Sequence, residues 1–575
     1  MEKLNLSDII IISITGISVL DFIIFTLLFV TYLLTIQYKT FKWSTRISSI
    51  TIMLFFVVFK ILHIPAFLST ISIININIKY YDWCLVILTW VNIVLTSFPM
   101  ITALYTLVCK YFEKKEKDIT IYKNSNIMIV MPIYNETPEA LWKGIESVKN
   151  SDYNLDKIHL YLAFDDDKEP DAFKYIMKKW NKNYTENDKV INIEDKIKIS
   201  VCRFTHGGKK SAQKGAYKMI KKNYKEELQE SFLLFIDSDI QLKEDALYQF
   251  VKHMNKYNKT CITGMITCIT SENSSFLAFY QDVEYVSGQI FWRNFENYTG
   301  TTSCLPGAFT MMKWTSFDNI SKDYFFKTTY NDNFEYQRFY LGEDRYMTHL
   351  LMEKEPWKQG FCEAARCKTE APNDLTGLLK QRRRWFLGHI SNDTWMISSL
   401  YLWKTYPVFT LFNFLNNSRY TSVYIYLLYF VLLFNNNVNF ISWFLFLILP
   451  ILINWVFLMY YSFTLKRKMN VVFYVIIVLL QPIFNMLYMY YTIFTIKQQT
   501  WGGIRVDRAK STDYTLTNTS DNTSDNTFDN TSDNTSDNNS NNTSDNISNN
   551  TFDNNYDSIN EDINEDIEIV IHKNT

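Results

Sequence analysis

Two aspartates in the middle of the chain lie at the end of a short apolar run, FLLFID at 232–237: Asp237 is its last residue and Asp239 follows two positions later. Side chains alternate along a strand with a period of two, so a strand ending here would direct both carboxylates to one side. Paired carboxylates suit a hard divalent ion such as Mg²⁺ or Mn²⁺, which typically holds substrate phosphates too. A surface turn after a strand would look the same in isolation. The position of the pair at the carboxyl end of a buried strand favours a binding site.

Polar residues also follow two earlier apolar runs. The segment FDDD contains Asp165 and Asp166 after a strand-like stretch, although an acidic cap at a helix start is an alternative interpretation. The segment MPIYNE supplies a proline, an aromatic ring and a carboxylate, which could pack against a nucleobase and hydrogen-bond a ribose. A plain strand-to-helix connection would look similar. The residues of interest there are Pro132, Tyr134 and Glu136.

A glycine-lysine segment, HGGKKSAQKG, covers residues 206–215 and contains Lys209, Lys210 and Lys214 at the start of a predicted helix. Backbone N–H groups at a helix start, together with lysines, favour a bound phosphate. The spacing GxxxxGK[ST] of a Walker loop is absent, which disfavours nucleotide hydrolysis.

Later segments add a turn, a pair of acids and a cluster of arginines. CLPGAF at 304–309 brings Pro-Gly into an apolar run, where backbone can approach a ligand closely. Glu343 and Asp344 open an amphipathic helix, and such acids ordinarily serve as a favourable cap. With a diphosphate site in the same sheet, Asp344 becomes a candidate general base. QRRRW at 381–385 is either a lipid-facing basic collar or the holder of an anion.

The apolar runs before these residues predict the strands that would hold them in place. Short, β-rich and nearly continuous runs lie between helical segments such as 137–149 and 243–256. Runs of this kind are typical of buried parallel strands, and repeated βα units indicate a doubly wound sheet with ligands at the carboxyl ends of its strands. The four strands predicted in this way lie at 125–134, 158–164, 197–204 and 232–237.

The composition indicates a membrane protein with a basic body. Of 575 residues, 47% are apolar and 17% aromatic. Residues 511–575 carry fourteen Asp and Glu against one Lys, a net charge of −13, so the other 510 residues carry about +12 of the total of −1. Such a body suits anionic lipids or a small anionic ligand. The cysteines form no CxxC pair and the histidines no HExxH motif, which favours a reducing compartment and disfavours zinc.

Apolar stretches flank the central region. Stretches at 9–36, 47–74 and 83–111 are long enough to cross a bilayer, and the basic loop 37–46 places everything after residue 112 in the cytosol. Further stretches cover 406–434, 440–463 and 470–496, with Lys466-Arg467-Lys468 as a cytosolic marker. Gln481-Pro482 interrupts the last stretch, so a broken or re-entrant helix is an alternative to a span and the side of the C-terminus stays open. The acidic NTSD repeats of the tail predict disorder.

The predicted organisation has five parts. They are an N-terminal transmembrane region of about three helices (1–111), a cytosolic catalytic domain (112–385), an interfacial helix (386–405), a C-terminal transmembrane channel region (406–510) and a disordered acidic tail (511–575).

Taken together and in this order, the motifs resemble those of the chitin synthases, a branch of the family-2 inverting glycosyltransferases. The resemblance covers the soluble region and the last apolar stretch. Two departures occur: the usual SWGTR reads TWGGIR here, and the acidic strand end is Asp-Asp-Asp. The matching segments are GKKSAQ (208–213), DSD (237–239), CLPGAF (304–309), LGEDRYMT (341–348), KTEAPND (368–374), QRRRW (381–385) and WGGIR (501–505).

The resemblance implies a fold and a set of roles. The fold is an α/β GT-A-like glycosyltransferase domain with a doubly wound mixed sheet, embedded in an α-helical multi-pass membrane protein. Asp344 would be the catalytic base, and Asp239 with Asp237 would bind Mg²⁺ or Mn²⁺. The donor would be bound by Pro132, Tyr134, Glu136, Asp165, Asp166, Lys209 and Asp237, and the acceptor and diphosphate side would hold Glu343, Gln381, Arg382, Arg384, Trp385 and Trp501.

The implied activity is processive synthesis of chitin from UDP-N-acetylglucosamine at the plasma membrane, with inversion, the catalytic domain in the cytosol and the polymer passing through the membrane. The partners are the donor, the nascent chain and the bilayer; no nucleic acid is expected, and a homodimer is left open. Two alternatives remain. One is another β-glycan synthase of the hyaluronan type, and the other is a non-catalytic membrane scaffold whose arginines bind anionic lipid.

Overall fold

The computed structural model describes residues 123–166, 170–185, 188–225, 227–270, 274–326, 333–417 and 449–496. All of them belong to one unit of the chain, residues 1–507. Several predictions lie outside the described residues. These are the N-terminal transmembrane region 1–111, most of the stretch 406–434, the WGGIR segment with Trp501, and the acidic tail 511–575.

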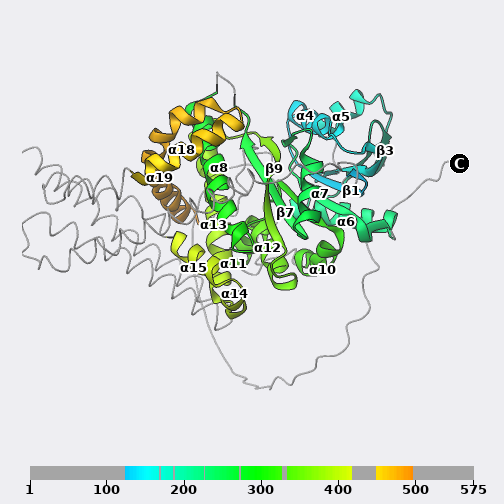
Figure 1. The fold of residues 1–575 in the computed structure, drawn as a ribbon. Coiled ribbons are helices and arrows are strands. Elements are labelled where there is room, and N and C mark those ends of the chain that lie inside the picture. Colours follow the sequence, from blue (N-terminus) through cyan, green and yellow to red (C-terminus); the bar gives the residue numbers. More distant parts are fainter. Residues whose placement is uncertain are drawn as a thin grey trace, which may run out of the picture. The chain divides into compact units, whose positions relative to one another are not determined.

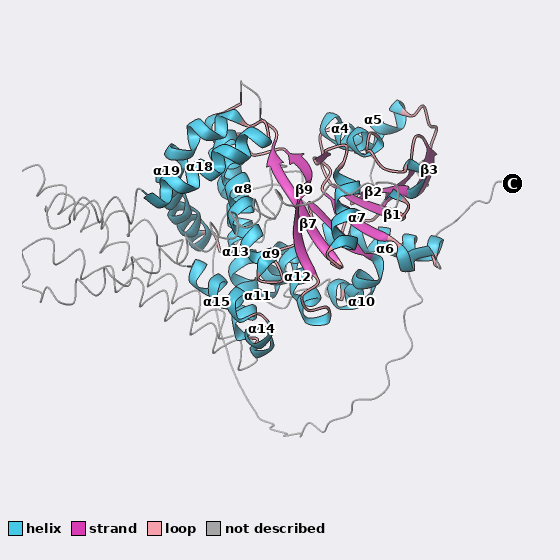
Figure 2. Ribbon diagram, viewed as in Figure 1, coloured by secondary structure: helices cyan, strands magenta, loops and turns pink. Residues whose placement is uncertain are grey.

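A nine-stranded mixed sheet forms the centre of the described region (Figures 1 and 2). Its strand order is β3-β4-β2-β1-β5-β8-β7-β9-β6. The strands are β1 (Ile127–Ile133), β2 (Ile158–Phe164), β3 (Val190–Glu194), β4 (Lys198–Arg203), β5 (Phe232–Ile236), β6 (Gln241–Leu242), β7 (Cys261–Cys268), β8 (Phe309–Lys313) and β9 (Gln359–Thr369).

The predicted parallel strands are confirmed. β1 pairs in parallel with β2 on one side and with β5 on the other, and β2 pairs in parallel with β4. The chain therefore leaves β1 first toward β4 and then returns to β5 on the opposite side. In open α/β sheets the ligand crevice lies at such a reversal, outside the carboxyl ends of the strands. The residues that follow β1 and β5 are thus placed together.

The other half of the sheet makes it mixed. β8 is antiparallel to both β5 and β7, while β7 and β9 run parallel. β8 follows CLPGAF, and its insertion between β5 and β7 brings that turn beside the end of β5. The backbone N–H of Asp237 donates to the carbonyl of Ala308 at 3.2 Å, which closes this junction.

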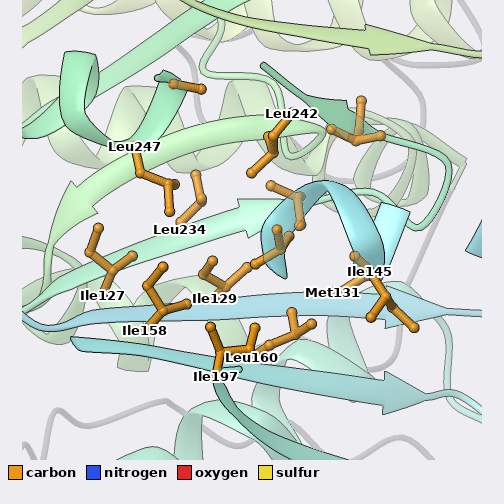
Figure 3. Packing of buried hydrophobic residues seen from close by; sticks show 14 of the residues in the cluster. Ile127, Ile129, Met131, Ile145, Ile158, Leu160, Ile197, Leu234, Leu242 and Leu247 are labelled. Atoms are coloured by element: carbon orange, nitrogen blue, oxygen red, sulfur yellow. The ribbon is translucent and has the colours of Figure 1, made fainter. Parts of the chain in front are cut away.

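Side chains that alternate along the strands pack into two apolar cores, one on each face of the sheet. On β1, Ile127, Ile129 and Met131 point to one face, where Ile145 of α4 and Leu247 of α7 pack in the same core (Figure 3). Helix α5 contributes to this core as well. Met128 and Val130 point to the other face, which is covered by α6, α10 and α12. Burial on both faces explains why these strands read as continuous apolar runs. The helices are α4 (Pro138–Lys149), α5 (Asp171–Lys179), α6 (Lys209–Tyr224), α7 (Ala246–Lys256), α10 (Trp314–Phe325), α11 (Asn333–Tyr336) and α12 (Glu343–Lys354).

A second group of helices packs beside the sheet, where α19 contacts both α8 and α13 (Figure 1). These helices are α8 (Phe276–Ser287), α9 (Asn294–Tyr298), α13 (Leu375–Ser398), α14 (Leu400–Thr405), α15 (Pro407–Asn416), α18 (Leu449–Thr464) and α19 (Lys468–Phe494). Short π-helical segments cover Gly288–Arg293 and Gln337–Leu341.

Two expectations change here. QRRRW and residues 386–398 share the single helix α13, so the predicted domain boundary at 385/386 falls inside one helix. α19 continues through Gln481 and Pro482, so the alternative of a broken last helix is wrong. The side chain of Gln481 is held there, accepting from Tyr280 Oη at 3.0 Å and donating to Asn485 Oδ1 at 3.1 Å. Within the described residues, one helix, Val472–Phe494, is long and apolar enough to cross a membrane.

Candidate active site

Lys209 is the point where separate sequence segments meet. It is the first residue of α6, directly after Gly208, whose φ of +84° suits glycine. Its Nζ lies 2.7 Å from Asp237 Oδ1 and 3.7 Å from Glu343 Oε1. A Cβ on Gly307 would lie 3.1 Å from the same Nζ. The glycine-lysine segment, the DSD turn, CLPGAF and the start of α12 therefore converge on one ammonium group.

The charged groups around Lys209 shift one another's pKa values. Burial raises the pKa of Glu343 to about 7, the neighbouring Asp344 adds to the rise, and Lys209 and Arg384 oppose it. For Lys209, burial acts to lower the pKa, but Asp237 and Glu343 outweigh burial and raise it. The ammonium group therefore stays charged among carboxylates, and Arg384 shares the same electrostatic environment. Buried groups whose pKa values are perturbed by one another in this way mark a candidate functional site.

The DSD acids lie beyond the strand rather than on it. β5 ends at Ile236, so Asp237 and Asp239 occupy the following turn, and the argument from strand alternation is wrong. Asp237 faces Lys209, whereas Asp239 Oδ2 accepts from Thr369 Oγ1 at 2.9 Å and from the Glu370 N–H at 3.3 Å. Among the described residues, no group of three or more His, Cys, Asp or Glu side chains is gathered in a way that could hold a metal ion.

A histidine missed by the sequence analysis organises the ends of β1 and β2. Asp165 is buried, and its Oδ1 accepts from the Gly207 N–H at 2.9 Å. Its Oδ2 lies 3.0 Å from His206 Nδ1, and that hydrogen bond raises the pKa of His206 to about 9. The imidazole stacks on Tyr134 with ring centroids 4.8 Å apart. Only its position before two glycines and three lysines could have pointed to His206.

The remaining predicted donor-site residues lie close to this edge in different ways. Glu136 faces the DSD turn, since its Oε2 accepts from Ser238 Oγ at 2.6 Å. Asp166 follows Asp165, and both carboxylates add to the effect of burial in raising the pKa of Tyr134. Pro132 is buried inside β1. It lies past the last residue of β1 that pairs with β5, where a missing N–H is tolerated.

Asp344 lies in the first turn of α12, held on both sides. Its Oδ1 accepts from the Arg345 N–H at 2.8 Å, and its Oδ2 lies 3.0 Å from the Sγ of Cys304. The helix starts against α13, because a Cβ on Gly342 would lie 2.8 Å from the Cα of Gly388. The start of α12 is thereby fixed relative to the helix that carries QRRRW.

The three arginines of QRRRW point to three different neighbours. Successive residues on an α-helix are rotated by about 100° around the helix axis, so consecutive side chains point in different directions. Arg382 Nη2 lies 2.5 Å from Glu284 Oε2, and its guanidinium group stacks 4.1 Å from the Trp385 ring. Arg383 binds the C-terminal end of α19. Arg384 is the arginine that acts electrostatically on Lys209 and Glu343.

The contacts of Arg383 are bidentate. Its Nε donates to Thr495 Oγ1 at 2.9 Å and its Nη2 donates to the Thr495 carbonyl at 2.8 Å. Thr495 follows the last residue of α19. A cation at a helix C-terminus is favourable because the final carbonyl groups carry partial negative charge. Arg383, which was not among the predicted site residues, therefore fixes the end of α19 against α13.

The structure thus gathers most of the predicted residues at one edge of the sheet. Gln381 accepts from Arg382 Nη1 at 3.2 Å, and Trp385 remains 39% exposed. The residues linked through Lys209 and its charges are Asp237, Glu343, Asp344 and Arg384. Tyr134, Asp165 and Asp166 form a neighbouring group at the ends of β1 and β2, and Trp501 lies outside the described residues.

Comparisons with known proteins agree with the motifs. A family model described as chitin synthase matches residues 217–537. The chain is 33% identical over 452 residues to chitin synthase 7 of Verticillium dahliae, covering 74% of this chain and 64% of that protein. It is 38% identical over 322 residues to chitin synthase G of Aspergillus niger, covering 53% of this chain and 42% of the relative. The chain therefore spans about two fifths to two thirds of the length of these relatives.

Among solved structures, the chain is similar to a mannosyltransferase of Pyrobaculum calidifontis in complex with GDP-Man and Mn²⁺. The two share 14% sequence identity with a TM-score of 0.39, over 68% of this chain and 98% of that one.

Proposed function

This chain belongs to the chitin synthase family, and from that membership we propose that it is a processive glycosyltransferase that makes chitin. It transfers N-acetylglucosamine from UDP-N-acetylglucosamine to the 4-hydroxyl of a growing chain, with inversion, and forms a β-1,4 bond. The observation that carries the proposal is the meeting of Asp237, Glu343 and Gly307 at Lys209. That meeting supports the proposal because a cation suited to a diphosphate would then lie beside the start of the helix that holds a candidate base.

The donor would lie across the carboxyl ends of β1, β2 and β5. His206 and Tyr134 present stacked rings next to Asp165, a combination suited to a uracil base and its ribose. Lys209 and the N–H groups at the start of α6 would then meet the diphosphate. Lys209 and Arg384 would stabilise the charge that develops on the departing UDP.

The donor set also fits a divalent metal. Mg²⁺ commonly binds through one or two carboxylates together with substrate phosphates, and the DSD turn offers two carboxylates at the proposed diphosphate position. Asp239 and Asp237 would hold Mg²⁺ or Mn²⁺ there. When bound, the ion would neutralise charge on the diphosphate leaving group.

Asp344 would act as the general base. Its carboxylate would take the proton from the 4-hydroxyl of the acceptor sugar as that oxygen attacks the anomeric carbon from the face opposite UDP. Trp385, partly exposed on α13, would offer the acceptor sugar the ring face that the Arg382 guanidinium group does not cover. Gln381, Arg382 and Trp501 complete the proposed acceptor side.

We place the catalytic domain in the cytosol beneath a multi-pass plasma-membrane region that passes the polymer outward. Arg467, in the basic loop between α18 and α19, supports this arrangement. Its Nη1 lies 2.6 Å from the fully buried Asp282 Oδ1, and its Nη2 donates to Thr267 Oγ1 at 2.8 Å. The loop predicted to be cytosolic is therefore attached to the catalytic domain itself.

The test is Asp344→Asn in membranes supplied with labelled UDP-N-acetylglucosamine and Mg²⁺ or Mn²⁺. We expect polymer synthesis to be lost while the protein still inserts and binds UDP. Glu353→Gln, an exposed acid on the same helix, is the matched control and should retain synthesis. Polymer formation near the wild-type rate by Asp344→Asn would refute the assignment and favour a non-catalytic scaffold. Digestion of the wild-type product by chitinase, but not by hyaluronidase, distinguishes chitin from a hyaluronan-type glycan.

A further inference from the structure

The carboxylate of Asp344 is in contact with a thiol. Cys304 Sγ lies 3.0 Å from Asp344 Oδ2, and the cysteine side chain is buried. Cys304 opens the CLPGAF segment, forty residues before Asp344. The other oxygen of the same carboxylate accepts from the Arg345 N–H at 2.8 Å. Each oxygen of Asp344 therefore has a donor that is fixed to the protein.

A second link ties the same two segments together. The hydroxyl of Thr348 donates to the Asp344 carbonyl at 2.7 Å and accepts from the Leu305 N–H at 2.8 Å. Thr348 is completely buried, so neither bond competes with bulk water. Thr302 Oγ1 also donates to the Cys304 carbonyl at 3.2 Å. The peptide unit that joins Cys304 to Leu305 is therefore held at both its carbonyl and its N–H, and this keeps the thiol at the carboxylate.

The thiol serves as a donor rather than a nucleophile. Burial, with the charge of Asp344 added to it, raises the pKa of Cys304 far above its ordinary value, so the S–H proton is retained. A thiol is a weak hydrogen-bond donor. It can therefore orient the carboxylate while withdrawing less basicity from it than a hydroxyl in the same place would.

We propose that Cys304 is a positioning residue for the general base: its S–H fixes the orientation of the Asp344 carboxylate and, because it is a weak donor, leaves that carboxylate basic enough to accept a proton. The proposal rests on the proposed function, since it requires Asp344 to be the base. Cys304 itself does not contact the sugar substrates in this role.

The experiment compares Cys304→Ser and Cys304→Ala with the wild type in full-length protein, as pH profiles of kcat/KM for polymer synthesis. A hydroxyl donates more strongly and favours the ionised carboxylate, so Cys304→Ser should move the acidic limb to lower pH by roughly 0.5 unit and reduce the plateau rate. Removing the donor should move the limb of Cys304→Ala to higher pH by a similar amount. Cys362→Ser is the matched control. That buried thiol donates to the Gln249 carbonyl of α7, on the face of the sheet opposite α12, so its replacement should leave the limb in place.

The outcomes separate this proposal from the function on which it rests. Opposite shifts of the acidic limb, with UDP binding retained, support a positioning role. Profiles of both variants that match the wild-type profile after scaling would show that Cys304 matters only for packing. If Asp344→Asn keeps its activity, the assignment of the base itself fails, whatever the cysteine variants do. UDP binding by each variant shows that the fold is intact.

Discussion

Gly342 and Gly388 are in direct backbone contact: a Cβ on Gly388 would lie 2.8 Å from the Cα of Gly342. Gly342 precedes Glu343 and Asp344, and Gly388 lies three residues after Trp385 on α13. Asn392 Nδ2 reinforces the crossing by donating to the carbonyls of Gly342 at 3.2 Å and Gly388 at 2.9 Å. The distance between the proposed base and the proposed acceptor platform is set at this crossing.

Gly388→Ala should therefore separate the two helices. Backbone atoms cannot yield as a flexible side chain can, so we expect a loss of about 1–3 kcal/mol in the free energy of unfolding and a fall in kcat of about 100-fold. Thermal unfolding in detergent and polymer synthesis measure the two effects. Gly288→Ala is the control, since a Cβ there meets nothing within 4 Å. Equal behaviour of the two variants would contradict the close crossing.

Lys209→Met should damage donor binding and turnover together. Without the ammonium group, Asp237 and Glu343 face each other's charge with no cation between them, and the departing diphosphate loses a positive partner. We expect kcat/KM for UDP-N-acetylglucosamine to fall about 100-fold or more. Lys218→Met, an exposed lysine on the same helix, should change it little. A Lys209→Met enzyme with ordinary donor kinetics would remove Lys209 from the site.

His206→Gln should lose stability in a pH-dependent way. The pKa of His206 is raised from 6.5 to about 9 by Asp165, so the protonated ring stabilises the fold fully below pH 6.5. That contribution is lost as the pH rises through about 9. We expect the melting temperatures of wild type and variant to differ most at pH 6 and to converge above pH 9. A difference that stays constant over this range would show that the Asp165–His206 ion pair does not contribute.

Arg467→Met should be more harmful than the double variant Arg467→Met, Asp282→Asn. The single change leaves the fully buried Asp282 charge without its partner and should cost roughly 3 kcal/mol of unfolding free energy. The added Asp282→Asn removes that charge while its side-chain oxygen still accepts from the Cys268 N–H. Melting temperatures of both variants and of Asp282→Asn alone give the coupling. A double variant less stable than Arg467→Met would contradict a buried ion pair.

The sequence by itself determined the parallel half of the sheet and the identity of most candidate residues. Strands β1, β2, β4 and β5 are largely buried on both faces, so each is a mostly apolar run. The acids that follow β1, β2 and β5 lie at the carboxyl edge of the sheet. The resemblance of the motifs then pointed to the family, which the comparisons confirm. These features depend on local composition and on the order of segments along the chain.

Only the tertiary structure decided which of these residues meet. Lys209 contacts Glu343, Cys304 contacts Asp344, and Arg383 contacts Thr495. The partners are far apart in the sequence, and the periodicity of a single helix or strand cannot predict such contacts. The first two contacts accompany the insertion of β8 between β5 and β7, which carries CLPGAF to the site. The last depends on helical rotation, because three consecutive arginines on α13 must face three different neighbours. Which residue a side chain contacts depends on how segments distant in the sequence pack together. The sequence of one segment alone does not determine that packing.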